Sequence, residues 1–156
     1  WVKFHFSKKL VCDMKTKLYF AYGANMHPKS MQHRCPNATP VKQFDLRGWE
    51  LKFYNHATVV PNQSATVPGV LWTVTDDCEY NLDCFEGYPT YYTKKTWIQD
   101  DIEFFFYEMT PEMSSGIPGY LYVSDMVASY KHWNIPSDTL EAVAYANHVR
   151  QKTYTF

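Results

Sequence analysis

The stretch that decides the fold reads Leu18-Tyr-Phe-Ala-Tyr-Gly-Ala-Asn-Met26, with Pro28 two positions further on. Its first five residues are apolar or aromatic and uncharged, which is typical of a strand buried on both faces. Gly23 then allows a positive φ and a close approach of the backbone, and Pro28 favours the first turn of a helix. This order predicts a strand, a tight loop and a helix. The free loop N–H groups suit a carboxylate or phosphate, and an ordinary strand-to-helix turn is the alternative.

The composition indicates one domain and argues against a nucleic-acid partner. The chain has 156 residues, a net charge of −1 and no run of basic residues, so it lacks the positive field that a phosphate backbone requires. Tyrosine occurs 13 times and aromatic residues make up 18% of the chain. Such a composition suits either a cleft lined by rings with polar tips or an aromatic-rich core.

The spacing of the cysteines and the lack of long apolar runs favour a cytoplasmic protein without a metal. The four cysteines form no Cys-x-x-Cys pair and no zinc-like spacing with the scattered histidines, so we expect reduced thiols. No apolar run is long enough for a signal peptide or a membrane span. Residues 1–13 are interpreted as an N-terminal extension that need not be part of the fold, and residues 14–156 as the domain.

The remaining pattern predicts an α+β domain. Period-two alternation and apolar runs indicate strands, with Pro61 ending the run 57–60, and helical spacing of apolar residues together with Gly87 indicates the helices. Gly69 marks a bulge or a close backbone approach. The expected strands are 18–22, 44–54, 57–60, 67–74 and a hairpin of 91–99 with 102–109, and the expected helices are 27–34, 76–86, one through Tyr122, Met126 and Tyr130, and 139–152.

Glu86 is the strongest candidate for proton transfer. It lies at the end of a predicted helix, where the dipole opposes ionisation, and its neighbours Phe85, Tyr88, Tyr91 and Tyr92 are aromatic. Both effects raise the pKa of its carboxyl from about 4.3 toward about 6, which suits a proton shuttle near pH 7. A solvent-exposed glutamate at a helix end is the alternative.

Five motifs in this order resemble the gamma-glutamylcyclotransferase-like family, the AIG2-like superfamily that includes gamma-glutamylamine cyclotransferases. They read Tyr22-Gly23-Ala24-Asn25, Arg34-Cys35-Pro36, Gly48-Trp49, Gly69-Val70-Leu71-Trp72 and Glu86-Gly87-Tyr88-Pro89. The resemblance runs from about Lys17 to about Val143. Ala24 and Gly119 each replace a serine of the family, and both changes bear on substrate identity more than on reaction type.

The resemblance implies a small mixed β-barrel flanked by helices and an enzyme of the acyltransferase or lyase type. A γ-glutamyl amine or peptide would cyclise to 5-oxoproline and release the free amine, without a metal or another cofactor. Glu86 would be the general acid and base. The loop of Tyr22, Gly23, Ala24 and Asn25 would bind the substrate's α-carboxylate, and Tyr122 would orient the substrate unless it is simply a core tyrosine.

Other residues are weaker candidates, and one other function stays open. Cys35 and Cys84 lack a base at a recognisable spacing, so packing explains them better than nucleophilic catalysis. Arg34 fits a structural role, and His56 is expected to border the cleft. The alternative function is a catalytically idle family member that binds or sequesters a small anionic metabolite. The small-molecule substrate is the only partner expected, and the sequence leaves the oligomeric state open.

Overall fold

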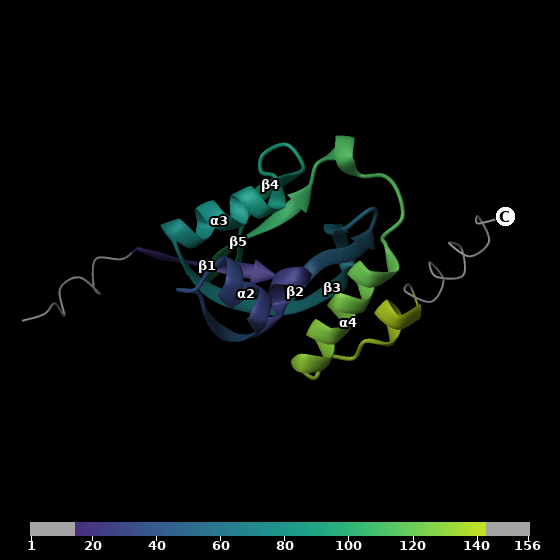
Figure 1. Ribbon diagram of the computed structural model, residues 1–156, viewed down its shortest axis with the longest axis horizontal. Helices are drawn as coiled ribbons and strands as arrows, with labels where there is room; N and C mark the ends of the chain where they lie inside the picture. The colour runs from purple at the N-terminus through teal and green to yellow at the C-terminus, as the bar shows by residue number, and fades with distance from the viewer. Residues whose placement is uncertain (1–14, 143–156) are drawn as a thin grey trace, which may run out of the picture.

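The computed structural model describes residues 15–142 as a five-stranded sheet with helices packed against it (Figure 1). The interpretation of residues 1–13, and most of the predicted last helix, lie outside the described residues; residues 138–142 are helical. The elements in chain order are β1 (Thr16–Ala21), η1 (Ala24–Met26), α2 (Pro28–Arg34), β2 (Thr39–Phe53), β3 (Ala57–Thr75), α3 (Asp76–Glu86), β4 (Tyr92–Gln99), β5 (Ile102–Met109), η2 (Pro111–Met113) and α4 (Tyr120–His132).

The sheet has the strand order β2-β3-β1-β5-β4. β1 lies in its centre, pairing antiparallel with β3 and parallel with β5, while β2 with β3 and β4 with β5 form antiparallel pairs. The mixed α+β class is therefore confirmed. The two outer strands, β2 and β4, do not pair with each other, so the sheet is open and the expected barrel describes it only loosely.

β3 differs from the prediction, because one strand of 19 residues replaces two short ones. Pro61 does not end it. The register with β2 jumps there instead: Arg47 pairs with Thr66 and Trp49 with Pro61, around a bulge at which Gly48 has a φ of 83°. Proline is tolerated at such an irregularity because no ladder hydrogen bond is required of it. β2 pairs with both halves of β3 and joins them into one strand.

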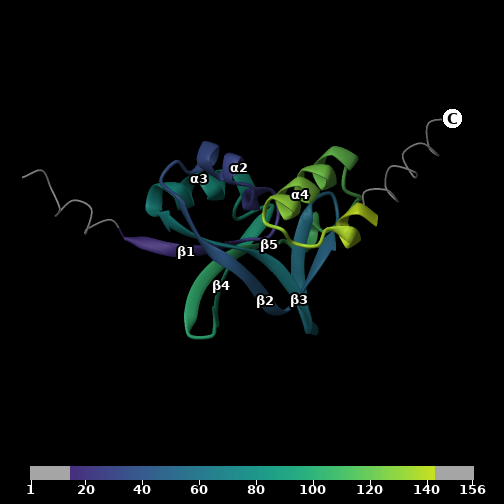
Figure 2. The same cartoon turned by 90° about the horizontal axis from the view of Figure 1, so that it is seen from below.

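Three helices lie on one side of the strands, as Figure 2 shows for α2, α3 and α4. The predicted ends of α3 are confirmed. Thr75 caps its first turn by accepting a hydrogen bond from the Cys78 N–H at 3.3 Å, and Gly87 ends it in the left-handed conformation with a φ of 64°. Among residues 15–142, no helix is both long and apolar enough to cross a bilayer.

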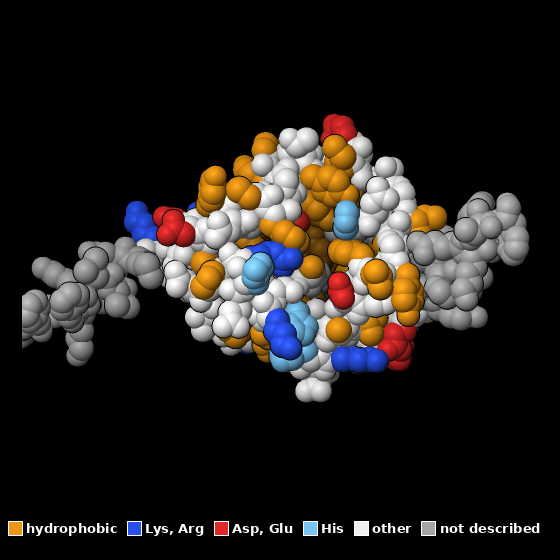
Figure 3. All heavy atoms as spheres, in the orientation of Figure 1, with side chains coloured by type: hydrophobic (Ala, Val, Ile, Leu, Met, Phe, Trp, Pro, Cys, Tyr) orange, Lys and Arg blue, Asp and Glu red, His pale blue; other side chains and the backbone are white. Residues whose placement is uncertain are grey.

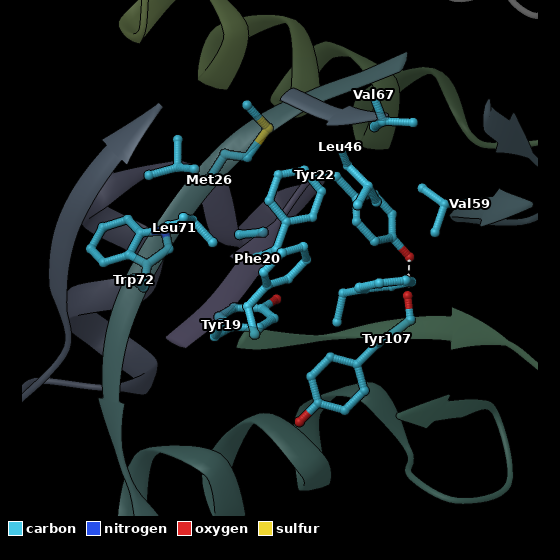
Figure 4. Packing of buried hydrophobic residues seen from close by; sticks show 14 of the residues in the cluster. Tyr19, Phe20, Tyr22, Met26, Leu46, Val59, Val67, Leu71, Trp72 and Tyr107 are labelled. Carbon is cyan, nitrogen blue, oxygen red and sulfur yellow. Dashed lines mark hydrogen bonds between the residues drawn. The ribbon is translucent and has the colours of Figure 1, made fainter. Parts of the chain in front are cut away.

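Aromatic side chains dominate the core beneath these helices (Figure 4). Phe20 on the central strand packs against Phe44 and Phe104 from strands on either side, with ring centroids 6.0 Å away in both cases. The Tyr22 hydroxyl donates a hydrogen bond of 2.6 Å to the backbone oxygen of Tyr107, drawn as a dashed line in Figure 4. Tyrosines therefore contribute both to the core and to a cleft, since several of the buried ones also line the pocket described below.

Gly69 provides the close backbone approach that the sequence predicts. A Cβ atom there would lie 2.4 Å from the backbone oxygen of Ala21 and 2.5 Å from the Phe20 ring. We expect Gly69→Ala to lower the free energy of unfolding by about 1–3 kcal/mol, because β1 and β3 must separate to admit the methyl group. Urea unfolding measures this. Gly119→Ser, placed where a Cβ meets nothing within 4 Å, is the control, and equal midpoints for the two variants would contradict the prediction.

Candidate active site

A cavity of about 350 Å³ is lined by residues of η1, of the end of α3 and of α4, among others. Figure 3 shows the hollow near the centre of the face in view, with hydrophobic side chains inside it. Segments far apart in the sequence form its wall, which consists of Tyr19, Tyr22, Gly23, Ala24, Asn25, His56, Ala57, Cys84, Phe85, Glu86, Gly87, Tyr91, Tyr92, Tyr107 and Tyr122. All six residues predicted for the site are among them.

Glu86 is the carboxylate of this pocket. The left-handed turn at Gly87 ends α3 directly after it, and its Oε1 accepts a hydrogen bond of 3.3 Å from Nδ2 of Asn25. Burial raises the pKa of Glu86 to about 7, and the nearby Arg34 guanidinium acts in the opposite direction. The direction agrees with the prediction. Of the aromatic neighbours expected around it, Tyr88 does not line the pocket, since its ring faces Lys94 at 4.5 Å.

The loop after β1 lies in the pocket wall, but not in the predicted conformation. Gly23 has a φ of −129° and a ψ of −131°, so the expected positive φ is wrong. The loop turns instead through η1, where the Met26 N–H donates to the Gly23 oxygen at 3.0 Å. The N–H groups that begin such a turn, those of Ala24 and Asn25, have no acceptor within it. A loop with free amides in the wall of a pocket is therefore present, although its glycine is not left-handed.

The side chains of this loop make internal contacts. Tyr22 is buried, and its hydroxyl donates the hydrogen bond to the Tyr107 backbone oxygen described above. Asn25 is 2% exposed, and besides Glu86 its Nδ2 donates to the Tyr19 hydroxyl at 3.1 Å. Its Oδ1 accepts a hydrogen bond of 2.6 Å from Nη1 of Arg34. Asn25 thus contacts the candidate catalytic carboxylate directly.

Tyr122 closes the pocket from α4. Its hydroxyl accepts a hydrogen bond of 3.0 Å from the Ala57 N–H and lies 3.7 Å from the position of a Cβ on Gly23. Burial raises the pKa of Tyr122 to about 12, so the phenol is neutral near pH 7. Met126 and Tyr130, on the same helix, are in the core, whereas Tyr122 is half-buried and borders the cavity.

His56 lies in the turn between β2 and β3 and borders the cavity, as expected. Its Nδ1 is 2.8 Å from the Tyr91 hydroxyl, and its ring meets that of Tyr122 edge-on with centroids 4.9 Å apart. Tyr19 and Tyr107 also line the pocket, and the Tyr107 hydroxyl donates to Asp83 Oδ1 at 2.6 Å. Sequence reasoning gave Tyr91 only a part in the desolvation of Glu86, and it gave no role to Tyr19 or Tyr107, because tyrosines in strands are equally typical of a core.

Arg34 has a structural position at the end of its helix, as the sequence analysis expected. It ends α2, reaches Asn25 and stacks on the Phe85 ring, with its guanidinium carbon 3.5 Å from the ring centroid. Of the two thiols for which packing was predicted, Cys35 fits that prediction and Cys84 does not. Cys35 is buried, and burial raises the pKa of its thiol to about 12, while Cys84 is exposed in the pocket wall. Among residues 15–142, no group of three or more His, Cys, Asp or Glu could hold a metal ion.

Residues 19–133 match the family described as Gamma-glutamyl cyclotransferase, AIG2-like, and the chain belongs to this family. A solved gamma-glutamyl cyclotransferase superposes with a TM-score of 0.71 at 23% identity, over 83% of this chain and 86% of that one. The human uncharacterized protein loc79017 gives a TM-score of 0.70 at 24% identity, over 82% and 86%. YkqA from Bacillus subtilis gives 0.65 at 16% identity, over 87% of this chain and 55% of that one. No curated protein matches the chain.

Proposed function

We propose that the protein cyclises a γ-glutamyl amine or peptide to 5-oxoproline and releases the free amine. One observation carries this proposal: Glu86 lies in a largely aromatic pocket, and burial brings the pKa of its carboxyl to about 7. A group with that pKa both accepts and returns a proton near neutral pH. Membership of the gamma-glutamyl cyclotransferase family supports the same reaction.

The reaction is an intramolecular acyl transfer in which the enzyme supplies position and a proton carrier. Glu86 removes a proton from the α-ammonium of the substrate, and the freed amine attacks the γ-carbonyl carbon. A carbon–nitrogen bond forms in the ring as the bond to the leaving amine breaks, and Glu86 returns the proton to that amine. The ring nitrogen loses a second proton as the lactam forms, and the released amine takes it up and leaves as an ammonium ion. Holding the amine next to the carbonyl supplies much of the acceleration, because the free substrate rarely adopts that geometry.

The loop amides are the proposed anchor for the α-carboxylate. Within residues 15–142 no lysine or arginine side chain lines the cavity, so the donors that these residues offer to this group are neutral. The N–H groups of Ala24 and Asn25 are available, and the Tyr122 hydroxyl lies above the same loop. A volume of about 350 Å³ is at the small end of the usual range for small-molecule sites, and it suits a γ-glutamyl group.

A panel of γ-glutamyl amines, γ-glutamyl amino acids and glutathione tests the proposal. We expect at least one of them to yield 5-oxoproline and free amine in equal amounts, measured by chromatography of the purified reaction. Chelators are not expected to stop it, since no step uses a metal. Tight binding of γ-glutamyl compounds without 5-oxoproline across the panel would instead favour a sequestering protein, in keeping with Ala24 and Gly119 in place of the family serines.

A further inference from the structure

The buried amide of Asn25 links a cation to the candidate catalytic carboxylate. Its Oδ1 accepts from Arg34 at 2.6 Å, and its Nδ2 donates to Glu86 at 3.3 Å and to Tyr19 at 3.1 Å. We propose that Arg34 is a positioning residue, which fixes the orientation of the Asn25 amide and through it the Glu86 carboxylate. The catalytic consequence rests on the function proposed above, whereas the contact itself does not.

Donor and acceptor chemistry shows why Arg34 decides the orientation. A guanidinium has donors and no acceptor, so only an oxygen satisfies it. If the Asn25 amide were turned over, its NH₂ group would face the guanidinium and its oxygen would face the Glu86 carboxylate. Two donors would then meet at Arg34 and two acceptors at Glu86. With Arg34 present, the two N–H groups of Asn25 must point to Glu86 and Tyr19. A neutral residue that both donates and accepts would permit either orientation.

Arg34 is itself held in place. Its guanidinium stacks on Phe85, the residue before Glu86, and its backbone oxygen accepts a hydrogen bond of 3.0 Å from Nδ2 of Asn81. Stacking and bonding within the plane are compatible for a guanidinium, whose flat face contacts the ring while its edge donates. These two contacts, with Phe85 and with Asn81, link Arg34 at the end of α2 to α3.

Arg34 is also the cation that acts on Glu86. The titratable side chains around the carboxylate from the other elements are His56 and the phenols of Tyr19, Tyr22, Tyr91, Tyr92, Tyr107 and Tyr122. Burial raises the pKa of all six phenols, so they are neutral where Glu86 titrates. Within residues 15–142 Glu86 forms no ion pair at 4.0 Å or less. The charge of Arg34 opposes the effect of burial on its pKa, and loss of that charge should raise the pKa further.

The test follows the Glu86 carboxyl carbon by NMR titration of the full chain without substrate. Arg34→Gln keeps a donor but also accepts, and we expect its Glu86 to titrate at higher pH than in the wild type. Arg34→Met should give the same direction and decides the matter if the first variant does not fold. Arg47→Met removes an equal charge from an exposed pair with Asp100 and should leave the titration unchanged.

The kinetic readout follows from the same contact. For a substrate found in the panel, Arg34→Gln should lower kcat at pH 7 by about 10- to 100-fold, the usual worth of a hydrogen bond to a charged group, with KM little changed. Arg34→Lys, which again only donates, should recover part of this loss. A wild-type titration of Glu86 in a folded Arg34→Gln or Arg34→Met variant would overturn the positioning role. Failure of the wild type to release 5-oxoproline would overturn the proposed function alone.

Discussion

Glu86→Gln is expected to reduce turnover by about 10²–10⁴-fold while substrate still binds. The amide has nearly the shape of the carboxyl group and can still receive the hydrogen bond from Asn25, but it cannot carry a proton between the two amines. Release of 5-oxoproline under saturating substrate measures the loss, and calorimetric titration with the same substrate measures binding. Turnover within a few-fold of the wild type would remove Glu86 from the mechanism.

The pH dependence provides the matched control for this substitution. Wild-type activity should rise as pH increases through about 7, where Glu86 loses its proton, and the residual rate of Glu86→Gln should lack that step.

The stability of the wild type should instead fall as the pH increases over this range. The folded protein holds this proton more tightly than the unfolded chain, whose glutamate titrates near 4.5, so the free energy of unfolding falls between about pH 4.5 and 7. Above pH 7, Glu86→Gln should therefore melt at a higher temperature than the wild type.

N-acetylation of an active γ-glutamyl substrate is expected to abolish product formation altogether. The α-nitrogen is the nucleophile of the proposed reaction, and an amide nitrogen is neither basic nor nucleophilic enough to attack the γ-carbonyl. The γ-amide that would be cleaved is untouched, so the comparison isolates the attacking group. Mass spectrometry of the reaction, for both the 5-oxoproline derivative and the free amine, measures the outcome.

Methylation of the leaving amine, at a position away from its nitrogen, serves as the control for added bulk. Such a substrate retains the nucleophile and should still cyclise. Release of amine together with N-acetylglutamate would mean that water attacks the γ-carbonyl, and the reaction would then be ordinary amide hydrolysis rather than cyclisation.

Local chemistry made much of the fold predictable. The uncharged run ending at Tyr22 predicted a strand buried on both faces, and Pro28 and Gly87 predicted where helices begin and end. The missed feature was β3, since Pro61 reads as a strand end in sequence. Only pairing with β2, which spans both halves of β3 and accommodates the proline beside a bulge, makes the strand continuous. That pairing is a long-range property and has no local signal.

The candidate site was predictable to a similar degree. Glu86 and the loop of residues 22–25 were found because their motifs are contiguous, and the structure brings them within one cavity. The conformation of Gly23 was not, because a glycine permits many conformations and its sequence position does not select one. The structural role of Arg34 was expected, but its partners were not: the buried amide of Asn25 and the Phe85 ring reach it only when two helices pack together.

The pocket is assembled from seven separate segments, from Tyr19 on the central strand to Tyr122 on α4. None of them holds more than a few of the wall residues. A fragment that carried Glu86 with all its neighbours in sequence would lack the loop, the histidine turn and the lid from α4. The pocket therefore exists only when the whole domain is folded. Natural selection for its chemistry acts on substitutions deep in the sheet as well as on those beside the carboxylate.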